Sequence, residues 1–160
     1  MNLREDKGYT YGVYSRFARP NAPASFRVLG DFNPETAGAA VVEILAELAR
    51  IRTEPMAEAE LADAKGQIIG GFALAMEDPA RFADQLAARA LTGVPIEELN
   101  EYLARLEAVT AAEAMAAAAK YIDSDAPLIV VVGDAATLKP QLEAIRPVLV
   151  VDGNGNPIEE

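Results

Sequence analysis

The stretch GYTYGVYSRFARPNAPASFRVLGDF, residues 8–32, decides the fold class. Residues 8–17 alternate in polarity and are rich in aromatic side chains, which is typical of a β-strand, and residues 25–32 have the same character. Between them RPNAP, residues 19–23, carries two prolines and predicts a turn. The stretch therefore predicts two antiparallel strands, as a hairpin or the start of a meander.

Helical patterns follow the predicted strands. Asn33 and Pro34 have the residue types of an N-cap and a first helical position, and Thr110 with Glu113 forms a Ser/Thr-x-x-Glu capping box. Between and after these signals, apolar residues recur at helical spacing. Helices are expected over residues 36–51, 57–77, 81–91, 95–109 and 111–122. Within the second of them GQIIGG, residues 66–71, permits either close packing of a neighbouring element or a local bend, and close packing is expected.

The C-terminal part predicts two more strands. APLIVVVGDA, residues 126–135, is a continuous apolar run of the kind that is buried on both faces of a sheet, and VLVVD, residues 148–152, is a shorter one. A short helix is expected between them, over residues 137–145, with Pro140 near its first turn. Residues 153–160 form a polar tail.

This order of elements predicts an α+β fold in which a mostly antiparallel sheet is covered by helices. The 160 residues, 51% of them hydrophobic, suit one domain over residues 1–160. Four strands form a small sheet compared with the number of helices predicted to cover it. We therefore expect a domain that lacks its first strands and exposes a sheet edge, through which the chain self-associates.

Composition excludes several classes of function. The formal net charge of −11 opposes binding to nucleic acids and to anionic membranes, and it permits attraction of basic peptides. The chain has no cysteine and no histidine, so it lacks thiolate chemistry, the commonest general base and the commonest zinc ligand. No apolar run is long enough for a membrane span, and the charged residues 4–7 do not fit a signal peptide.

Three clusters of polar residues are better explained by helix ends than by a site. Gly133-Asp134 follows an apolar run as in anion-binding turns, but the aspartate would repel phosphate, and an ordinary N-cap is expected. The carboxylates at residues 58, 60 and 63 lie near a helix start, where the helix dipole favours them. Glu77 is expected to cap a helix or to pair with Arg81.

LREDKGYTYG, residues 3–12, is the strongest candidate for a site. If Gly8 turns the chain into a strand, Tyr9 and Tyr11 share one strand face, and the Arg4 guanidinium and the Tyr11 phenol can converge on one point. Two hydrogen-bond donors aimed at one oxygen are suited to stabilising an oxyanion. The alternative is that Arg4 is a surface base paired with a neighbouring acid and that Tyr11 is an ordinary strand residue.

The same stretch resembles a motif of the pitrilysin-type, or inverzincin, zinc peptidases, whose members include insulin-degrading enzyme and the mitochondrial processing peptidases. The motif is Leu-Arg, a few charged residues, Gly, an aromatic or aliphatic residue, a small residue, and Tyr-Gly, and residues 3–4 and 8–12 fit it. The similarity continues in linear order through FRVLGDF, ELARIRTEP, AELADAKGQIIGGFALAMED, LTGVPIEELNEYLARLEAVTAAEAMAAAAKYI and LIVVVGDA. It is strongest to the shorter bacterial members, which often occur as two partner chains.

In that family two homologous domains enclose a peptide. One carries the H-x-x-E-H motif, in which histidines hold zinc and the glutamate is the general base, and the other carries an Arg/Tyr pair that reaches the scissile carbonyl. The resemblance assigns that pair to Arg4 and Tyr11, with Tyr9 as a substrate-binding neighbour and fallback. Because the chain has no histidine, it is expected to bind no zinc itself and to be inactive alone.

The resemblance thus implies the non-zinc half of a metallopeptidase, with a zinc-bearing domain or subunit and a peptide as its partners. A periplasmic or secreted location of the full-length protein is compatible with the family. Core subunits of respiratory complexes share the fold and act as assembly scaffolds, so a purely structural domain is the alternative. A nucleotide- or anion-binding domain built on VVVGDA, residues 130–135, is the weakest hypothesis.

Overall fold

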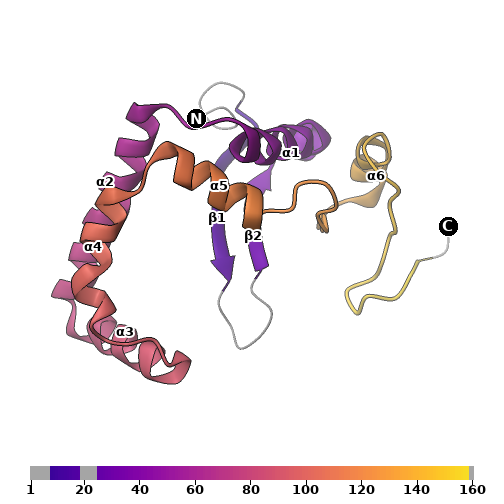
Figure 1. The fold of residues 1–160 in the computed structure, drawn as a ribbon. Coiled ribbons are helices and arrows are strands. Elements are labelled where there is room, and N and C mark those ends of the chain that lie inside the picture. Colours follow the sequence, from indigo (N-terminus) through magenta and orange to yellow (C-terminus); the bar gives the residue numbers. More distant parts are fainter. Residues whose placement is uncertain (1–7, 19–24, 159–160) are drawn as a thin grey trace. The chain divides into compact units, whose positions relative to one another are not determined.

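The structure is a computed structural model that describes residues 8–18 and 25–158, without the side chains of Tyr11 and Ala18. Figure 1 shows the chain as a ribbon. The described residues contain two strands, one short 3-10 helix and six α-helices. In chain order they are β1 (Thr10–Ala18), β2 (Ser25–Phe32), η2 (Pro34–Thr36), α1 (Ala37–Thr53), α2 (Glu58–Glu77), α3 (Pro79–Thr92), α4 (Glu98–Ala108), α5 (Ala111–Tyr121) and α6 (Ala135–Glu143).

The chain divides into two compact units. The first consists of residues 1–50 and 120–160, and the second of residues 51–119. Each unit is described separately below.

In the first unit, β1 and β2 form an antiparallel two-stranded sheet, as the sequence predicts (Figure 1). The register places Phe17 opposite Phe26, and their rings lie 5.0 Å apart at 57°, which is a favourable cross-strand aromatic pair. The predicted turn at 19–23 lies outside the described residues. The antiparallel sheet and the helices that follow it confirm the predicted α+β fold class.

The N-terminus of α1 is fixed by two residues that are distant in the sequence. The Asn33 side chain accepts a hydrogen bond from the Glu35 amide at 3.0 Å, as expected of an N-cap. Gln141 of α6 then binds this helix start, because its Oε1 accepts from the Gly38 amide at 3.1 Å and its Nε2 donates to the Pro34 carbonyl at 2.8 Å. One amide side chain thus joins α6 to the η2–α1 segment.

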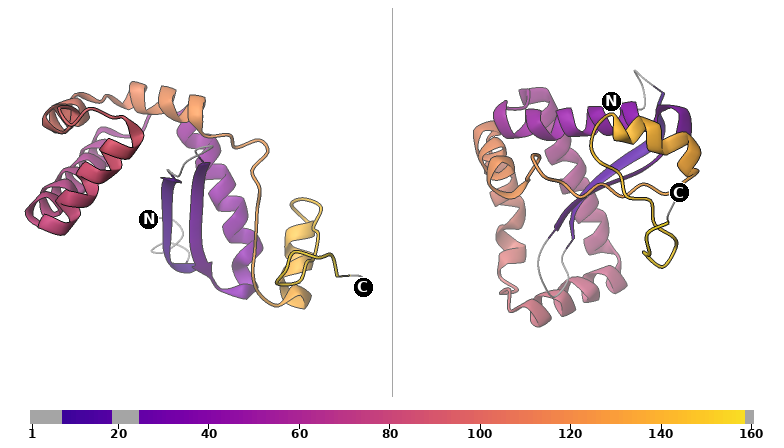
Figure 2. Two further views of the ribbon diagram at one scale, coloured as in Figure 1. Left: turned by 90° about the horizontal axis from the view of Figure 1, so that it is seen from below. Right: turned by 90° about the vertical axis from the view of Figure 1, so that its right-hand side faces the viewer.

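The two C-terminal strand predictions are wrong. Residues 127–132 have no regular secondary structure and run as an extended segment between α5 and α6 (Figure 2), and residues 148–152 contribute only one isolated bridge, Val151 to Pro157. An apolar run predicts a strand only where a neighbour pairs with it, and in the described residues no neighbour pairs with residues 127–132, whose Leu128 and Val132 are 90% and 95% exposed. The expected short helix is α6, which begins two residues earlier than predicted, so Pro140 lies in its second turn.

In the second unit, α2 contacts α3 and α4, and the rings of Phe72 and Tyr102 lie 5.0 Å apart between α2 and α4. No residue of α2 is buried, and Ile68 in its predicted apolar stripe is 46% exposed. The expected close approach at 66–71 is wrong, since a Cβ added at Gly66, Gly70 or Gly71 would meet no atom of the described chain within 4 Å.

The capping box at the start of α5 is confirmed. The Thr110 amide donates to the Glu113 carboxylate at 2.8 Å, and the Glu113 amide donates to the Thr110 hydroxyl at 3.2 Å. The hydrogen bond from the Thr110 amide, followed by that from its hydroxyl, lowers the pKa of Glu113 below its ordinary value. The ionised carboxylate is therefore the form that the folded helix stabilises.

This lowered pKa predicts the pH dependence of the cap. A carboxylate whose pKa is lowered by folding contributes stability above its ordinary pKa of about 4.5 and loses it as pH falls through the lowered folded value. We expect Glu113→Gln to lower the urea midpoint at neutral pH, and the difference from the parent chain to shrink toward zero in acid. Glu101→Gln, at an exposed residue in the first turn of α4, makes the same change of charge and serves as the control. A difference that persists unchanged at acid pH would contradict the assignment.

Candidate functional site

The candidate site begins where the chain enters β1. Gly8 has φ +64°, a left-handed conformation that glycine adopts without steric cost, so it supplies the turn expected from the sequence. Tyr9 follows it, and its carbonyl accepts a hydrogen bond from the Asn33 amide at 3.1 Å. This hydrogen bond ties the backbone just before β1 to the residue that follows β2.

Tyr11 occupies a β-bulge. Thr10 lies opposite Phe32 and Gly12 lies opposite Asp31, so two steps along β1 match one step along β2, and Tyr11 is the extra residue. A bulge bends its strand and changes the direction of the side chains beside it, and bulges are frequent next to active sites. The predicted alternation of residues 9, 11 and 13 on one face is therefore interrupted at the candidate residue itself.

The side chain of Thr10 holds the bulge in place. Its hydroxyl accepts a hydrogen bond from the Gly12 amide at 3.1 Å and lies within hydrogen-bonding distance of the carbonyls of Gly12, at 3.0 Å, and Asp31. One hydroxyl thus spans both ends of the irregularity and reaches across to β2. Sequence reasoning missed this role, although a glycine within a strand pattern is a known signal of a bulge.

Two glycines give the bulged backbone its space. A Cβ at Gly30 would lie 3.0 Å from the Gly12 carbonyl oxygen and 2.9 Å from the Phe32 ring, and a Cβ at Gly12 would lie 3.2 Å from the Tyr14 hydroxyl. Real Cβ contacts are seldom so short, so side chains at these positions would push the strands or rings apart. The sheet is therefore built for close backbone approach beside Tyr11.

The predicted site residues are only partly located. Arg4 lies outside the described residues. Tyr11 has its backbone in β1, and its side chain also lies outside the described part. Tyr9 precedes β1 and is half-buried. The convergence of Arg4 and Tyr11 on one point therefore stays a prediction, and what the structure adds is the bulge that carries one member of the pair.

The residues of this chain do not fit a zinc centre. In the described residues, no group of three or more His, Cys, Asp or Glu side chains is arranged to hold a metal ion. The full sequence contains neither histidine nor cysteine, the ligands that zinc sites in proteins most often use. In the same part of the chain, none of the helices is long and apolar enough to span a membrane.

Asp134 is an N-cap, as expected. Its carboxylate accepts hydrogen bonds from the Thr137 hydroxyl at 2.7 Å and from the Ala136 amide at 3.3 Å, at the first turn of α6. These bonds, that from Thr137 first, lower the pKa of Asp134. The aspartate thus places a negative charge where a bound phosphate would lie, which argues against the anion-binding hypothesis.

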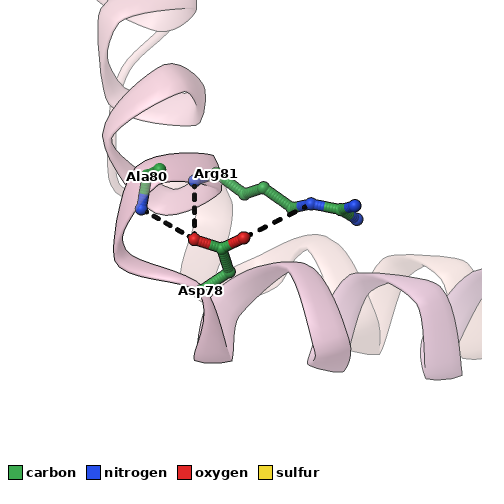
Figure 3. Close-up of polar contacts among 3 residues, drawn as sticks. All are labelled: Asp78, Ala80 and Arg81. Carbon is green, nitrogen blue, oxygen red and sulfur yellow. Dashed lines mark hydrogen bonds and ion pairs between the residues drawn. The ribbon is translucent and has the colours of Figure 1, made fainter.

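Asp78, and not Glu77, caps α3 and pairs with Arg81, so that part of the expectation is wrong. Figure 3 shows the Asp78 carboxylate accepting from the amides of Ala80, at 2.9 Å, and Arg81, at 3.4 Å, while the Arg81 Nε lies 3.6 Å from its other oxygen. Asp78 precedes Pro79 at the first helical position, where a capping carboxylate reaches the free amides.

A shallow groove of about 430 Å³ lies in the second unit, between α2 and the junction of α4 with α5. Lys65 lines it and donates to the Glu107 carbonyl at 2.7 Å, which satisfies an acceptor at the end of α4. The polar contacts of Lys65 and of the capping box at residues 110–113 stabilise helix ends, so they give no evidence for a ligand in the groove.

Comparison with known proteins finds a family model and solved structures to which this chain is similar. Residues 1–68 match the family model described as the peptidase M16 inactive domain. The crystal structure of a peptidase M16 inactive domain from Pseudomonas fluorescens is similar to this chain, with a TM-score of 0.70 and 25% sequence identity over 78% of the chain. The match covers 29% of that protein's chain. A search of curated proteins found no match.

Both matches are to a peptidase M16 inactive domain, which agrees with the resemblance of this chain to the pitrilysin-type peptidases. They also agree with the α+β fold class. The region that matches the family model includes the Leu-Arg motif, the bulge at Tyr11 and β2, so the candidate site lies within the matched part of the chain.

Proposed function

We propose that this chain is the non-zinc half of a pitrilysin-type metallopeptidase and that it binds peptide for a zinc-bearing partner domain or subunit. The observation that carries the proposal is the β-bulge at Tyr11 within the region that matches the inactive-domain family model. An ordinary strand needs no bulge at this position. A bulge changes the direction of the side chains beside it, and bulges are over-represented next to active sites, which supports a functional role for Tyr11.

In this proposal the chain contributes hydrogen-bond donors. The Arg4 guanidinium and the Tyr11 hydroxyl donate to the scissile carbonyl oxygen and stabilise the negative charge that develops on it. Comparable donors contribute about 3–4 kcal/mol each to transition-state stabilisation. The partner domain supplies the zinc and the general base. Tyr9, which lies one step before the strand, contacts the peptide beside the carbonyl.

Reconstitution tests the proposal. The chain, the zinc-bearing domain of the same peptidase and their mixture are each incubated with an internally quenched fluorescent peptide. We expect hydrolysis by the mixture and at most residual hydrolysis by either component, because the base and the carbonyl donors are then on different chains. Assembly of the two without any gain in hydrolysis would contradict the proposal and favour the scaffold hypothesis.

A further inference from the structure

Thr10 is the residue whose side chain joins the two sides of the β-bulge at Tyr11. A threonine hydroxyl has one proton to donate and two lone pairs that accept. Here it accepts from the Gly12 amide at 3.1 Å and lies within hydrogen-bonding distance of the Asp31 carbonyl on β2. The Gly12 carbonyl, at 3.0 Å, is the other acceptor within its reach. One side chain before the bulge therefore contacts both the backbone after it and the strand opposite.

These contacts restrain the backbone at Tyr11. A bulge leaves its extra residue out of the regular ladder, so the conformation of that residue depends on other interactions. Thr10 and Gly12 are its two neighbours in the chain, and the hydrogen bond joins the side chain of one to the amide of the other. This bond is partly buried, where water competes with it less than at an exposed hydrogen bond.

We propose that Thr10 is a positioning residue, which sets the place of the Tyr11 phenol through the backbone of the bulge. The inference rests on the proposed function, in which that phenol donates to the scissile carbonyl. A donor stabilises the developing charge only at the correct distance and direction, and a displacement of about 1 Å can cost about 10²-fold in rate. Thr10 thus acts on the reaction only through Tyr11.

A general contribution to the stability of the strand is the alternative role of Thr10, because β-branched residues favour strands. The two roles differ in the part of the side chain that they need. Valine keeps the shape and the branch of threonine and lacks the hydroxyl, whereas serine keeps the hydroxyl and lacks the branch. Under the proposal, loss of the hydroxyl lowers turnover and loss of the branch does not.

Steady-state hydrolysis by the chain assembled with the zinc-bearing domain is the first test. We expect Thr10→Val to reduce kcat by about 10–10²-fold, less than Tyr11→Phe, and to leave KM nearly unchanged, because the phenol acts mainly on the transition state. Thr10→Ser should keep most of the parental kcat, because it keeps the hydroxyl. Thr92→Val is the matched control, since it removes a hydroxyl that donates to the Ala88 carbonyl at 2.7 Å in the other unit, and its kcat should equal that of the parent.

A double-mutant cycle separates positioning from stability. If Thr10 acts through the phenol, Thr10→Val should reduce kcat in the parent chain and have no further effect in the Tyr11→Phe background. Amide hydrogen exchange reports on the bulge itself. The Gly12 amide should exchange at least about tenfold faster in Thr10→Val than in Thr10→Ser, because only the first variant removes its acceptor.

Three results overturn the inference. Parental kcat in Thr10→Val beside a large loss in Tyr11→Phe refutes the positioning role and leaves the proposed function in place. Parental kcat in Tyr11→Phe removes the donor on which both depend. Equal losses from Thr10→Val with and without Tyr11→Phe show that the threonine does not act through the phenol. If Thr10→Val does not fold, as judged by circular dichroism, Thr10→Ala also removes the hydroxyl and replaces it in every comparison.

Discussion

Tyr11→Phe is expected to reduce kcat of the assembled peptidase by about 10²–10³-fold, and Arg4→Ala by a similar factor, because each removes one donor to the developing oxyanion. The effect should appear mainly in kcat, since the donors act more strongly on the transition state than on the bound peptide. The measurement is the steady-state hydrolysis of a quenched fluorescent peptide by the parent and variant chains, each combined with the zinc-bearing domain.

Tyr14→Phe is the matched control for this experiment. Tyr14 lies on the same strand, past the bulge, and is 73% exposed, so the loss of its hydroxyl should change kcat by less than about twofold. Tyr9→Phe separates the preferred donor from the fallback. A large loss in Tyr9→Phe with none in Tyr11→Phe would transfer the role to Tyr9, and unchanged turnover in both tyrosine variants and in Arg4→Ala would refute the assignment.

Gly38→Ala is expected to lower the free energy of unfolding by about 1–3 kcal/mol, although alanine is the better helix former. The added Cβ would lie 2.8 Å from the Gln141 Cβ and 3.2 Å from the Gln141 carbonyl oxygen. Relief of this overlap must move α6 and weaken the bond from the Gly38 amide to the Gln141 side chain. Urea unfolding measures the loss, and faster amide exchange in α6 would locate it.

Gly70→Ala gives the opposite expectation and controls for helix propensity. Its Cβ would meet no atom of the described chain within 4 Å, so the substitution should stabilise the protein by up to about 1 kcal/mol. If both substitutions are stabilising, the contact of α6 with the start of α1 is not tight. If both are destabilising, the glycines of α2 have a packing partner outside the described chain.

Local sequence signals predicted those parts of the fold that local interactions determine. The hairpin of β1 and β2, the Asn33 N-cap and the Thr110–Glu113 capping box all depend on residues close in sequence, and all are present. The predicted strands at 126–135 and 148–152 failed because pairing requires a distant neighbour. The prediction of close packing at the glycines of residues 66–71 failed for the same reason, because close packing also requires an element on the opposite side.

The candidate site shows the same limit at one residue. The sequence placed Tyr11 in a strand after a glycine turn, which is where the structure has it. The sequence reading did not include the bulge, which arises from the pairing of Thr10 with Phe32 and of Gly12 with Asp31. The direction of a side chain in a strand thus depends on the register with the partner strand, and a period of two along one strand does not determine it.

The most direct measurement of the central claim compares two ligands of the assembled peptidase. A phosphinic peptide carries a tetrahedral anion that imitates the charge of the intermediate, and a matched amide peptide imitates the ground state. The account predicts that Tyr11→Phe weakens binding of the phosphinic peptide by about 10²-fold or more. Binding of the amide peptide, measured with a zinc domain whose general base has been replaced so that the peptide is not cleaved, should change by less than about threefold. Equal changes for both ligands, or no change for either, would contradict it.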